Sequence, residues 1–349
     1  MASIRSHLLN HLTRVLMWWM FRKREHPAIY RQKMERIDRK RARPVPEGLS
    51  YEDVSRPFPG RWIRNKDARP GQVILYLPGG AFIMRLPEGH SALVADLCAR
   101  AQTEAFMASY RLAPEHPYPA APQDALAAYR ELLNQGYAAH DIVVMGDSAG
   151  GNLAMALPHL IRSAGLTMPA GVIGLSPITD FAQISASWRL NRWRDPMYMV
   201  QSVVNPIQWY LANADLVLTE PAISPYYGDF SAFPRLYFMV GALEALVEDS
   251  VSMARKALDN GIPAKVHVWD GMPHVFLLHD VIPEAKLARQ QVAEWLQELR
   301  SPPPRVSKGG LERDVVRLFG YAAFTGHVSC ETNDRYRHEA RASLGSGPH

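Results

Sequence analysis

The chain has 349 residues, of which 47% are hydrophobic and 21% charged, so it has enough apolar material for a sizeable core. Its two cysteines exclude a disulfide framework and a four-cysteine metal site. Residues 1–50 carry twelve Lys and Arg against four Asp and Glu, a balance of +8 within a net charge of +5. The rest of the chain is therefore slightly acidic. Because a nucleic-acid-binding domain carries a basic face, we expect no nucleic-acid partner.

The first segment is predicted to be an amphipathic helix from Ser3 to about Glu25. Its apolar face recurs at three- and four-residue steps, at Ile4, Leu8, Leu12, Val15, Leu16 and Trp19. We expect this face to pack on the protein body as part of a cap. The alternative is that the helix, with Trp18, Trp19 and neighbouring Arg and Lys, lies in a membrane interface.

The apolar run Val15–Phe21 is the only candidate here for a membrane-crossing or secretion segment. It is too short to cross a bilayer, which takes about 20 residues. Arg22-Lys23-Arg24-Glu25 follows it, where a signal peptide would have small residues and a cleavage site. We therefore expect a cytoplasmic protein, with peripheral membrane association as the alternative.

After a second basic helix from Ile29 to about Arg41, short β-rich runs alternate with helical stretches up to about residue 300. The predicted strands are Val73–Leu77, Ala105–Ser109, Ile142–Met145, Val172–Leu175, Leu236–Val240 and Lys265–Trp269. The predicted helices cover about 90–102, 121–135, 149–164, 250–260 and 283–299. Several strands are continuously apolar, as expected when helices cover both faces. The alternation predicts an α/β fold with a mostly parallel, doubly wound sheet.

Two segments do not follow this alternation. Residues 181–220 contain helical apolar patches without a clear strand, and we expect them to join residues 1–50 in a helical cap. Residues 301–349 begin with Ser301-Pro302-Pro303-Pro304, which stops a helix. Their mixed charge and sparse apolar content predict a poorly ordered tail. The domain plan is therefore cap helices at 1–50, one domain at 51–300 with the insertion, and the tail.

The strongest motif is Gly146-Asp147-Ser148-Ala149-Gly150, a G-x-S-x-G sequence. It directly follows the apolar run Ile142–Met145 and precedes a helix-compatible run. In that context it predicts a sharp strand-to-helix turn that holds the serine in an exposed position above the sheet. The glycines allow the two backbones to approach closely. Ser148 is therefore the candidate nucleophile.

A serine hydroxyl needs a base within hydrogen-bond reach, and in folds with this turn the acid and then the base follow along the chain. The histidines after Ser148 and before the tail are His159, His267, His274 and His279. His267 lies inside a predicted strand and His159 in the helix after the nucleophile. His274 follows the strand that ends at Trp269, where an α/β sheet places its working groups. We predict His274 as the general base.

The acid is expected after the strand Leu236–Val240, where Glu244, Glu248 and Asp249 lie. Glu244 is nearest to the strand end. The other two are placed to begin the next helix, where a carboxylate is favoured by the helix dipole without a catalytic role. We predict that Glu244 orients His274 and stabilises its charged form.

The anion formed by attack on a carbonyl group needs backbone N–H donors nearby. One is predicted from Ala149, directly after the nucleophile. The others are predicted from Gly79 and Gly80, in the loop Pro78-Gly79-Gly80-Ala81-Phe82 that follows the first apolar strand. Pro78 has no N–H to donate.

Together these residues resemble the bacterial hormone-sensitive lipase family of α/β-hydrolase esterases. The resemblance covers roughly residues 50–300. It includes the run from Tyr110-Arg111-Leu112-Ala113-Pro114-Glu115-His116-Pro117 to Ala120, the nucleophile turn continued by Gly151-Asn152, Leu175-Ser176-Pro177, Asp195-Pro196, Ile223-Ser224-Pro225 and Gly271-Met272-Pro273-His274. By this resemblance the protein is a carboxylesterase that hydrolyses short- to medium-chain acyl esters without a metal or a cofactor.

The resemblance also assigns scaffold roles to four further residues, His90, Arg111, Glu115 and His116. Two positions depart from the family pattern. Pro78 stands where the family's oxyanion loop has histidine, and Ala81 replaces its last glycine. Glu244 stands where the family more often has aspartate, and its extra methylene changes the geometry toward His274.

Other functions remain open at this point. A non-catalytic binding protein on the same scaffold is the alternative from another class. An amidase, a deacetylase or a thioesterase would use the same residues, because the acyl-transfer chemistry is shared. We expect a small-molecule acyl ester as the substrate and leave a homodimer open.

Overall fold

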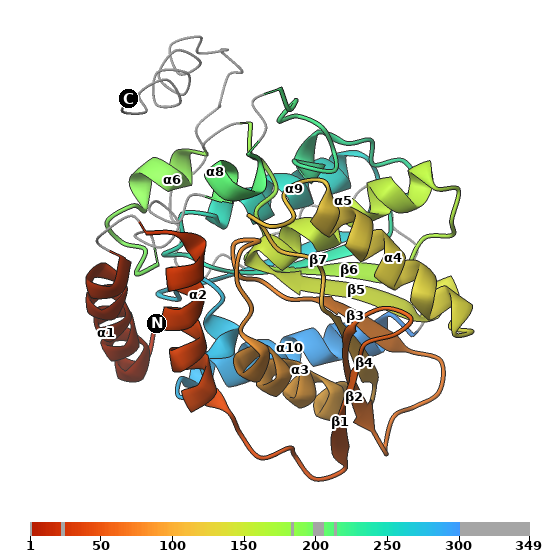
Figure 1. The fold of residues 1–349 in the computed structure, drawn as a ribbon, viewed down its shortest axis with the longest axis horizontal. Coiled ribbons are helices and arrows are strands. Elements are labelled where there is room, and N and C mark those ends of the chain that lie inside the picture. The colour runs from red at the N-terminus through yellow and green to blue at the C-terminus, as the bar shows by residue number, and fades with distance from the viewer. Residues whose placement is uncertain (1, 22–24, 183–184, 198–205, 213–214, 301–349) are drawn as a thin grey trace. The chain divides into compact units, whose positions relative to one another are not determined.

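The computed structural model describes residues 2–21, 25–182, 185–197, 206–212 and 215–300 (Figure 1). Within them an eight-stranded sheet has the order β1-β2-β4-β3-β5-β6-β7-β8. The strands are β1 Leu49–Val54, β2 Gly60–Asn65, β3 Val73–Leu77, β4 Glu104–Ala108, β5 Ile142–Asp147, β6 Gly171–Leu175, β7 Arg235–Gly241 and β8 Ala264–Trp269. The pairs β1–β2 and β2–β4 are antiparallel, and all other pairs are parallel.

The central strands are buried on both faces because helices cover both sides of the sheet. Every residue of β3, β5 and β6 is buried. Successive side chains point to opposite faces, so Leu75 contributes to one apolar core and Tyr76 to the other. The predicted mostly parallel, doubly wound sheet is confirmed, and its six predicted strands match β3 to β8 within one or two residues.

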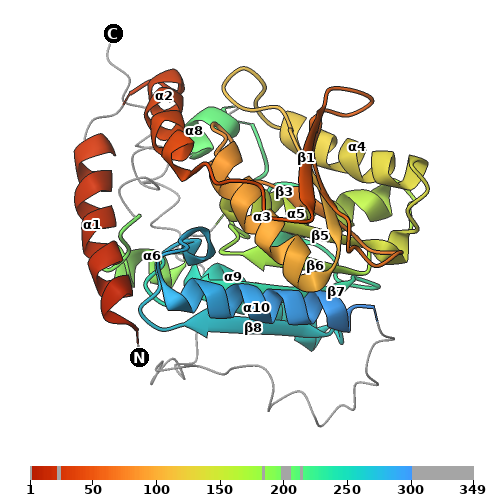
Figure 2. The ribbon, with the colours of Figure 1, turned by 90° about the horizontal axis from the view of Figure 1, so that it is seen from below.

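Two groups of helices form the outer layers (Figures 1 and 2). One face of the sheet carries α4 Ala120–Asn134, α5 Ser148–Ser163 and α9 Val247–Asp259, and the other carries α3 Pro87–Ala101 and α10 Pro283–Glu298. Short 3-10 turns lie at Arg39–Arg41, Ala139–Asp141, Pro225–Tyr227 and Phe276–Leu278. All five helices were predicted, which shows how regular the strand–helix alternation is.

The strands β1 and β2 were not predicted. They form the antiparallel edge of the sheet, where β1 has no buried residue. Such a strand lacks the continuous apolar run of the inner strands, and Glu52 and Asp53 make β1 look like a loop. A half-exposed antiparallel edge strand needs only weak apolar patterning.

Among the described residues, two helices precede the sheet and two short ones lie between β6 and β7. They are α1 Ile4–Phe21, α2 Pro27–Asp38, α6 Ala186–Leu190 and α8 Pro206–Tyr210. Both N-terminal helices were predicted close to these bounds. In the described part of the chain, no helix combines the length and the apolar character needed to cross a membrane. The predicted tail, residues 301–349, lies outside the described residues.

The expected orientation of α1 is wrong. Its apolar residues Ile4, Leu8, Leu12, Val15, Leu16 and Trp19 are all exposed. The helix instead buries Ser6 and Asn10 in its first half and Met17, Met20 and Phe21 near its end. Asn10 has a hydrogen-bond partner on the body side, since its Nδ2 donates to the Gly271 carbonyl at 2.9 Å, whereas Ser6 Oγ donates to the Ser3 carbonyl at the start of the helix. The spacing of the apolar residues identified which residues form the apolar face of α1. It did not show whether this face points toward the protein body or away from it.

Candidate active site

The predicted nucleophile lies at the junction of β5 and α5. Ser148 is the first residue of α5 and has φ +52°, in the left-handed region that residues with a side chain rarely adopt. A strained backbone of this kind persists only where the surrounding structure holds it. The turn therefore has the strand-to-helix geometry that the motif predicts.

Close backbone contacts explain the two glycines of this turn. A Cβ on Gly146 would overlap the Gly150 carbonyl oxygen, and a Cβ on Gly150 would overlap the Leu77 carbonyl oxygen. Any side chain at either position would push β3, β5 and α5 apart. The glycines thus allow the helix to begin directly against the sheet.

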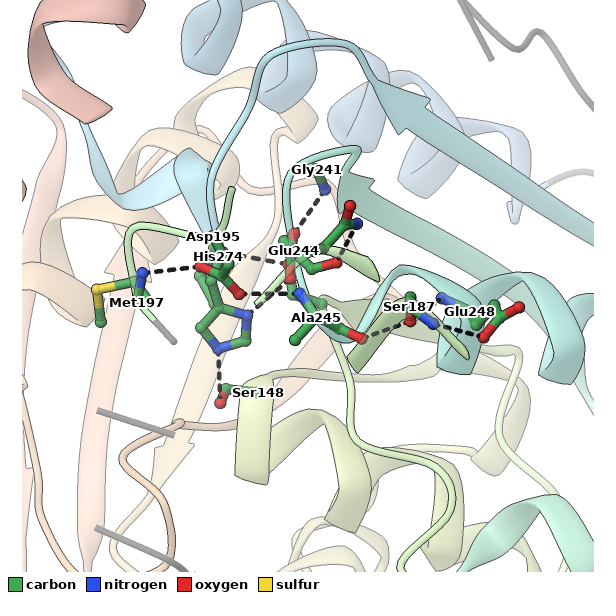
Figure 3. Close-up of polar contacts among 12 residues, drawn as sticks. Ser148, Ser187, Asp195, Met197, Gly241, Glu244, Ala245, Glu248 and His274 are labelled. Carbon is green, nitrogen blue, oxygen red and sulfur yellow. Dashed lines mark hydrogen bonds and ion pairs between the residues drawn. The ribbon is translucent and has the colours of Figure 1, made fainter. Parts of the chain in front are cut away.

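The three residues predicted to carry the chemistry lie in one chain of hydrogen bonds (Figure 3). His274 Nε2 is 2.9 Å from Ser148 Oγ, and His274 Nδ1 is 2.7 Å from Glu244 Oε2. The Glu244 side chain is fully buried, and that of His274 is 9% exposed. The extra methylene of Glu244 therefore does not prevent contact with the imidazole.

The electrostatic surroundings favour the charged form of His274. Burial alone would lower the pKa of His274, but the Glu244 carboxylate and its hydrogen bond, with Asp195 and Asp147 further away, raise it above the ordinary 6.5. An imidazole that gains a proton during attack would be stabilised here by the same carboxylates. This site is suited to a general base.

The other two candidate acids have different partners. Glu248 Oε2 accepts a hydrogen bond from the Ser187 N–H at 2.9 Å. Asp249 Oδ1 accepts from the Thr179 N–H at 2.8 Å, and the burial of this side chain raises the pKa of Asp249 to about 7. Both carboxylates hold the segment after β6, so Glu244 alone of the three contacts His274 in the described structure.

The other candidate histidines also have partners away from Ser148. His159 Nε2 lies 3.2 Å from the Pro225 carbonyl, and burial lowers the pKa of His159 to about 4. His267 lies beside Gln291, with 2.8 Å between Nδ1 and Oε1. Burial, with Arg41 and Arg289 nearby, lowers the pKa of His279 to about 3. The surroundings of these three histidines therefore indicate structural roles, not the role of a base for Ser148.

Ser176 is a site residue that the sequence analysis did not assign. Its Oγ donates to Glu244 Oε1 at 2.7 Å and accepts the Val275 N–H at 3.1 Å. One hydroxyl thus holds both the carboxylate and the residue after His274. Ser176 and Val275 have φ values of +51° and +46°, so strained backbone occurs on both sides of this contact. The signal was present in Leu175-Ser176-Pro177, directly at the end of β6.

The segment after α6 holds the Glu244 loop from the other side. Asp195 accepts the Ala245 N–H at 2.9 Å and the Met197 N–H at 2.7 Å, as Figure 3 shows. Asn191 Nδ2 donates to the Glu244 carbonyl at 2.8 Å. Burial raises the pKa of Asp195 to about 6. These contacts between distant segments could not be read from the sequence.

The predicted oxyanion loop is anchored by Asp147, the residue before the nucleophile. Asp147 Oδ1 accepts from the Gly79 N–H at 2.8 Å and from the Tyr76 hydroxyl at 2.7 Å, and His90 Nε2 is 3.1 Å from Oδ2. Burial alone would raise the pKa of Asp147, but His90 and these hydrogen bonds lower it, so the carboxylate stays charged. His90 thus has the scaffold role that the resemblance implies.

This anchoring changes the expectation for one predicted donor. Because the Gly79 N–H already donates to Asp147, it is not free to bind an anion at Ser148. Gly80, with φ +129°, and Ala149, directly after Ser148, keep the predicted role. The Pro78 carbonyl accepts from the Tyr110 hydroxyl at 2.6 Å, which fixes the loop where the family's histidine is missing.

Aromatic side chains adjoin the oxyanion loop. The Phe82 ring stacks on Tyr210 of α8 with 3.7 Å between centroids, and Phe181 is 6.3 Å from Phe82. Arg31 of α2 donates to the Ile83 carbonyl at 2.5 Å and forms an ion pair with Glu115. Elements of both predicted cap segments therefore contact this loop.

No group of His, Cys, Asp or Glu in the described residues could hold a metal ion.

The comparisons with known proteins agree with this geometry. A family model described as the alpha/beta hydrolase fold matches residues 74–278. An esterase of Acinetobacter venetianus is 34% identical over 229 residues, which are 65% of this chain and 75% of the relative. An acetyl-hydrolase of Streptomyces hygroscopicus is 34% identical over 237 residues, 68% of this chain and 78% of the relative.

The same relationship appears among solved structures. An esterase from the bacterial hormone-sensitive lipase family has a TM-score of 0.79 and 30% identity, covering 86% of this chain and 100% of its own. An esterase/lipase from an uncultured bacterium has a TM-score of 0.77 and 31% identity, covering 85% of this chain and 99% of its own. The chain belongs to the bacterial hormone-sensitive lipase family of α/β-hydrolase carboxylesterases.

Proposed function

We propose that the protein is a serine carboxylesterase that cleaves short- to medium-chain acyl esters through an acyl-enzyme intermediate. The observation that carries this proposal is the hydrogen-bond chain from Ser148 Oγ through His274 to Glu244, with links of 2.9 Å and 2.7 Å. A serine is nucleophilic only when a base can take its proton as it attacks, and this chain places such a base within reach.

In the first half-reaction Ser148 Oγ attacks the ester carbonyl carbon while His274 Nε2 accepts the hydroxyl proton. The carbonyl oxygen becomes an anion that the N–H groups of Gly80 and Ala149 bind. Glu244 stabilises the imidazolium without taking its proton. His274 then protonates the departing alkoxide, and the acyl group stays on Ser148.

The second half-reaction repeats these steps with water. His274 Nε2 removes a proton from water as its oxygen attacks the acyl carbon, and the same donors bind the new oxyanion. The proton returns to Ser148 Oγ as the carboxylic acid leaves. Each proton has an identified donor and acceptor, so no metal or cofactor is part of the proposal.

Two observations support a short acyl group. The relative from Streptomyces hygroscopicus is named an acetyl-hydrolase. In this chain, the ring of Phe82, at the end of the predicted oxyanion loop, stacks on Tyr210 with 3.7 Å between centroids. Rigid aromatic rings limit the room for a long, flexible chain.

A series of p-nitrophenyl esters from acetate to palmitate tests the proposal. We expect the highest kcat/KM on the shorter esters, and at least about a 10³-fold lower kcat for Ser148→Ala on all of them. An optimum on long-chain esters would refute the acyl preference. Equal rates for the two proteins would refute the role of Ser148.

A further inference from the structure

We propose that α1 and the segment after α6 form a docking face for a membrane that contains anionic lipids. The docking face consists of Ile4, Leu8, Leu12, Val15, Leu16, Trp18 and Trp19 of α1, with Leu190 and Trp193. This binding is independent of the proposed catalytic steps, because it requires no turnover.

The apolar residues of α1 are exposed as a continuous helical face. Their exposed fractions run from 43% at Leu16 to 88% at Ile4. Single exposed apolar residues are common on protein surfaces, but a contiguous set of this size marks an interaction site. In water such a face would normally turn toward the core. Something other than water is therefore expected to cover it.

Specific polar contacts hold α1 in this orientation. The Ser3 N–H donates to Glu284 Oε1 at 2.6 Å, and Asn10 Nδ2 donates to the Gly271 carbonyl at 2.9 Å. Near the other end, Met20 and Phe21 are buried in the core. The body thus binds the side of the helix that carries Asn10, Met20 and Phe21, and leaves the docking face outward.

A second segment extends the same face. Arg14 Nη2 of α1 donates to the Arg194 carbonyl at 2.8 Å, and Figures 1 and 2 show α6 beside α1. Leu190 and Trp193 in this segment are 56% and 76% exposed. Tryptophan is the residue most typical of the boundary between lipid tails and headgroups. Two separate parts of the chain therefore present lipid-compatible side chains together.

The charged side chains on the two segments that carry the docking face are all basic. Arg5 and Arg14 on α1, and Arg189, Arg192 and Arg194 beside α6, are exposed. Neither α1 nor residues 189–194 contain Asp or Glu. Arginines bordering an apolar face attract anionic headgroups while the apolar side chains enter the interface. Anionic lipid is the partner that satisfies both features.

A second copy of the chain is a poorer occupant. In a two-fold symmetric dimer each face meets its own equivalent, so the five arginines of one copy would lie near the five of the other. Like charges brought together in this way oppose association. The same charges favour a lipid surface that carries phosphate groups.

Docking would place the membrane next to elements of the active site. The Gly271 carbonyl that binds Asn10 lies three residues before His274, and Asn191, next to Leu190, binds the Glu244 carbonyl. The docking face is thus built on the segments that hold the acid and the base. Esters that dissolve in lipid would be concentrated beside the site by this arrangement.

Co-sedimentation of the full-length protein with vesicles tests the proposal. We expect binding to vesicles of phosphatidylcholine and phosphatidylglycerol, and the same binding by Ser148→Ala, which separates docking from catalysis. Replacing Leu8 and Trp19 by serine should weaken binding at least about tenfold, because two large apolar side chains are lost. Val217→Ser, which changes a residue 65% exposed but outside the docking face, is the matched control and should bind like wild type.

A second variant tests the contribution of the arginines to binding. Replacing Arg189 and Arg192 by glutamine should weaken binding to the anionic vesicles about 25-fold, since each basic residue near such a surface contributes about fivefold. Raising the salt concentration should weaken wild-type binding in the same direction. The variants at Leu8 and Trp19, at Arg189 and Arg192, and at Val217 should keep the far-UV circular dichroism spectrum and the hydrolysis rate on a soluble short ester, because the docking face excludes the site residues.

Three outcomes would overturn the proposal. Wild type could remain in the supernatant with anionic vesicles at low salt. The variant with serine at 8 and 19 could bind as tightly as wild type. Light scattering could show a dimer that this variant abolishes, which would identify the docking face as a contact between copies of the chain.

Discussion

Three carboxylates follow β7 closely in sequence, those of Glu244, Glu248 and Asp249. Of these, Glu244 is the one that contacts His274 in the described structure. We predict that Glu244→Gln lowers kcat by about 10³- to 10⁴-fold, because an amide can hold the wrong imidazole tautomer and cannot stabilise the imidazolium. Steady-state hydrolysis of a short p-nitrophenyl ester measures this.

Glu248→Gln is the matched control for that substitution. Glu248 binds the Ser187 N–H, and a glutamine oxygen can accept the same hydrogen bond. Its kcat should stay close to that of wild type. A larger loss at residue 248 than at residue 244 would reassign the acid.

The pH dependence of kcat/KM follows from the charge state of His274. The pKa of His274 is raised above 6.5 chiefly because Glu244 and its hydrogen bond outweigh burial, and only the neutral imidazole can accept the Ser148 proton. Activity should therefore fall as pH decreases through a value above 6.5. In Glu244→Gln the midpoint should move to lower pH, since the attracting charge is gone. An unchanged midpoint would mean that a group other than His274 controls the fall of kcat/KM at low pH.

The sequence predicted candidate residues whose positions depend on motif and chain order, and it missed residues whose contacts depend on folding. Ser148, Glu244 and His274 each follow a strand end, so their positions could be predicted. Ser176 and Asp195 act on loops about 70 and 50 residues away. The commitment of the Gly79 N–H to Asp147 likewise depends on the packing of two turns.

At the scale of elements, β3, β5 and α5 can pack closely at their junction because Gly146 and Gly150 have no side chains. We predict that Gly150→Ala lowers the free energy of unfolding by at least about 2 kcal/mol, because its Cβ would overlap the Leu77 carbonyl oxygen. Urea denaturation followed by circular dichroism measures this. Gly165→Ala is the control: no atom lies within 4 Å of its Cβ, so only the cost of φ +66° remains, about 1 kcal/mol. Equal losses would contradict the packing argument.

The inner strands and the edge strands differ in how well the sequence predicts them. Strands β3 to β8 were predicted because a strand that is buried on one or both faces needs apolar residues, and these appear in the sequence as short apolar runs. Strand β1 alternates half-buried and exposed residues and carries two acidic ones, so it resembles a loop. The helix α1 was predicted, but its apolar face was placed on the wrong side, because contacts with the body that the sequence does not show, the Asn10 hydrogen bond and the burial of Met20 and Phe21, accompany the observed orientation.

For the molecule as a whole, a buried carboxylate couples stability to pH. Burial, with Asp180 and Glu248 adding smaller effects, raises the pKa of Asp249 from 3.8 to about 7. The folded state therefore binds this proton more tightly than the unfolded state. The stability that this contributes is complete below the unfolded pKa of 3.8 and is lost as pH rises toward about 7.

Asp249→Asn removes this titration and tests the coupling. We predict that the Tm of the variant minus that of wild type increases as pH rises from about 4 to about 7, and stays level above that. Thermal unfolding monitored by circular dichroism at a series of pH values measures the difference. A difference that stays constant or decreases over this range would contradict the assignment.

Mass spectrometry of the protein quenched in acid during turnover of p-nitrophenyl acetate tests the catalytic account most directly. We predict one added acetyl group on the peptide that contains Ser148, and none in Ser148→Ala, which should also lose hydrolysis. An acetyl group bound stably to a different residue, with hydrolysis undiminished in Ser148→Ala, would contradict it.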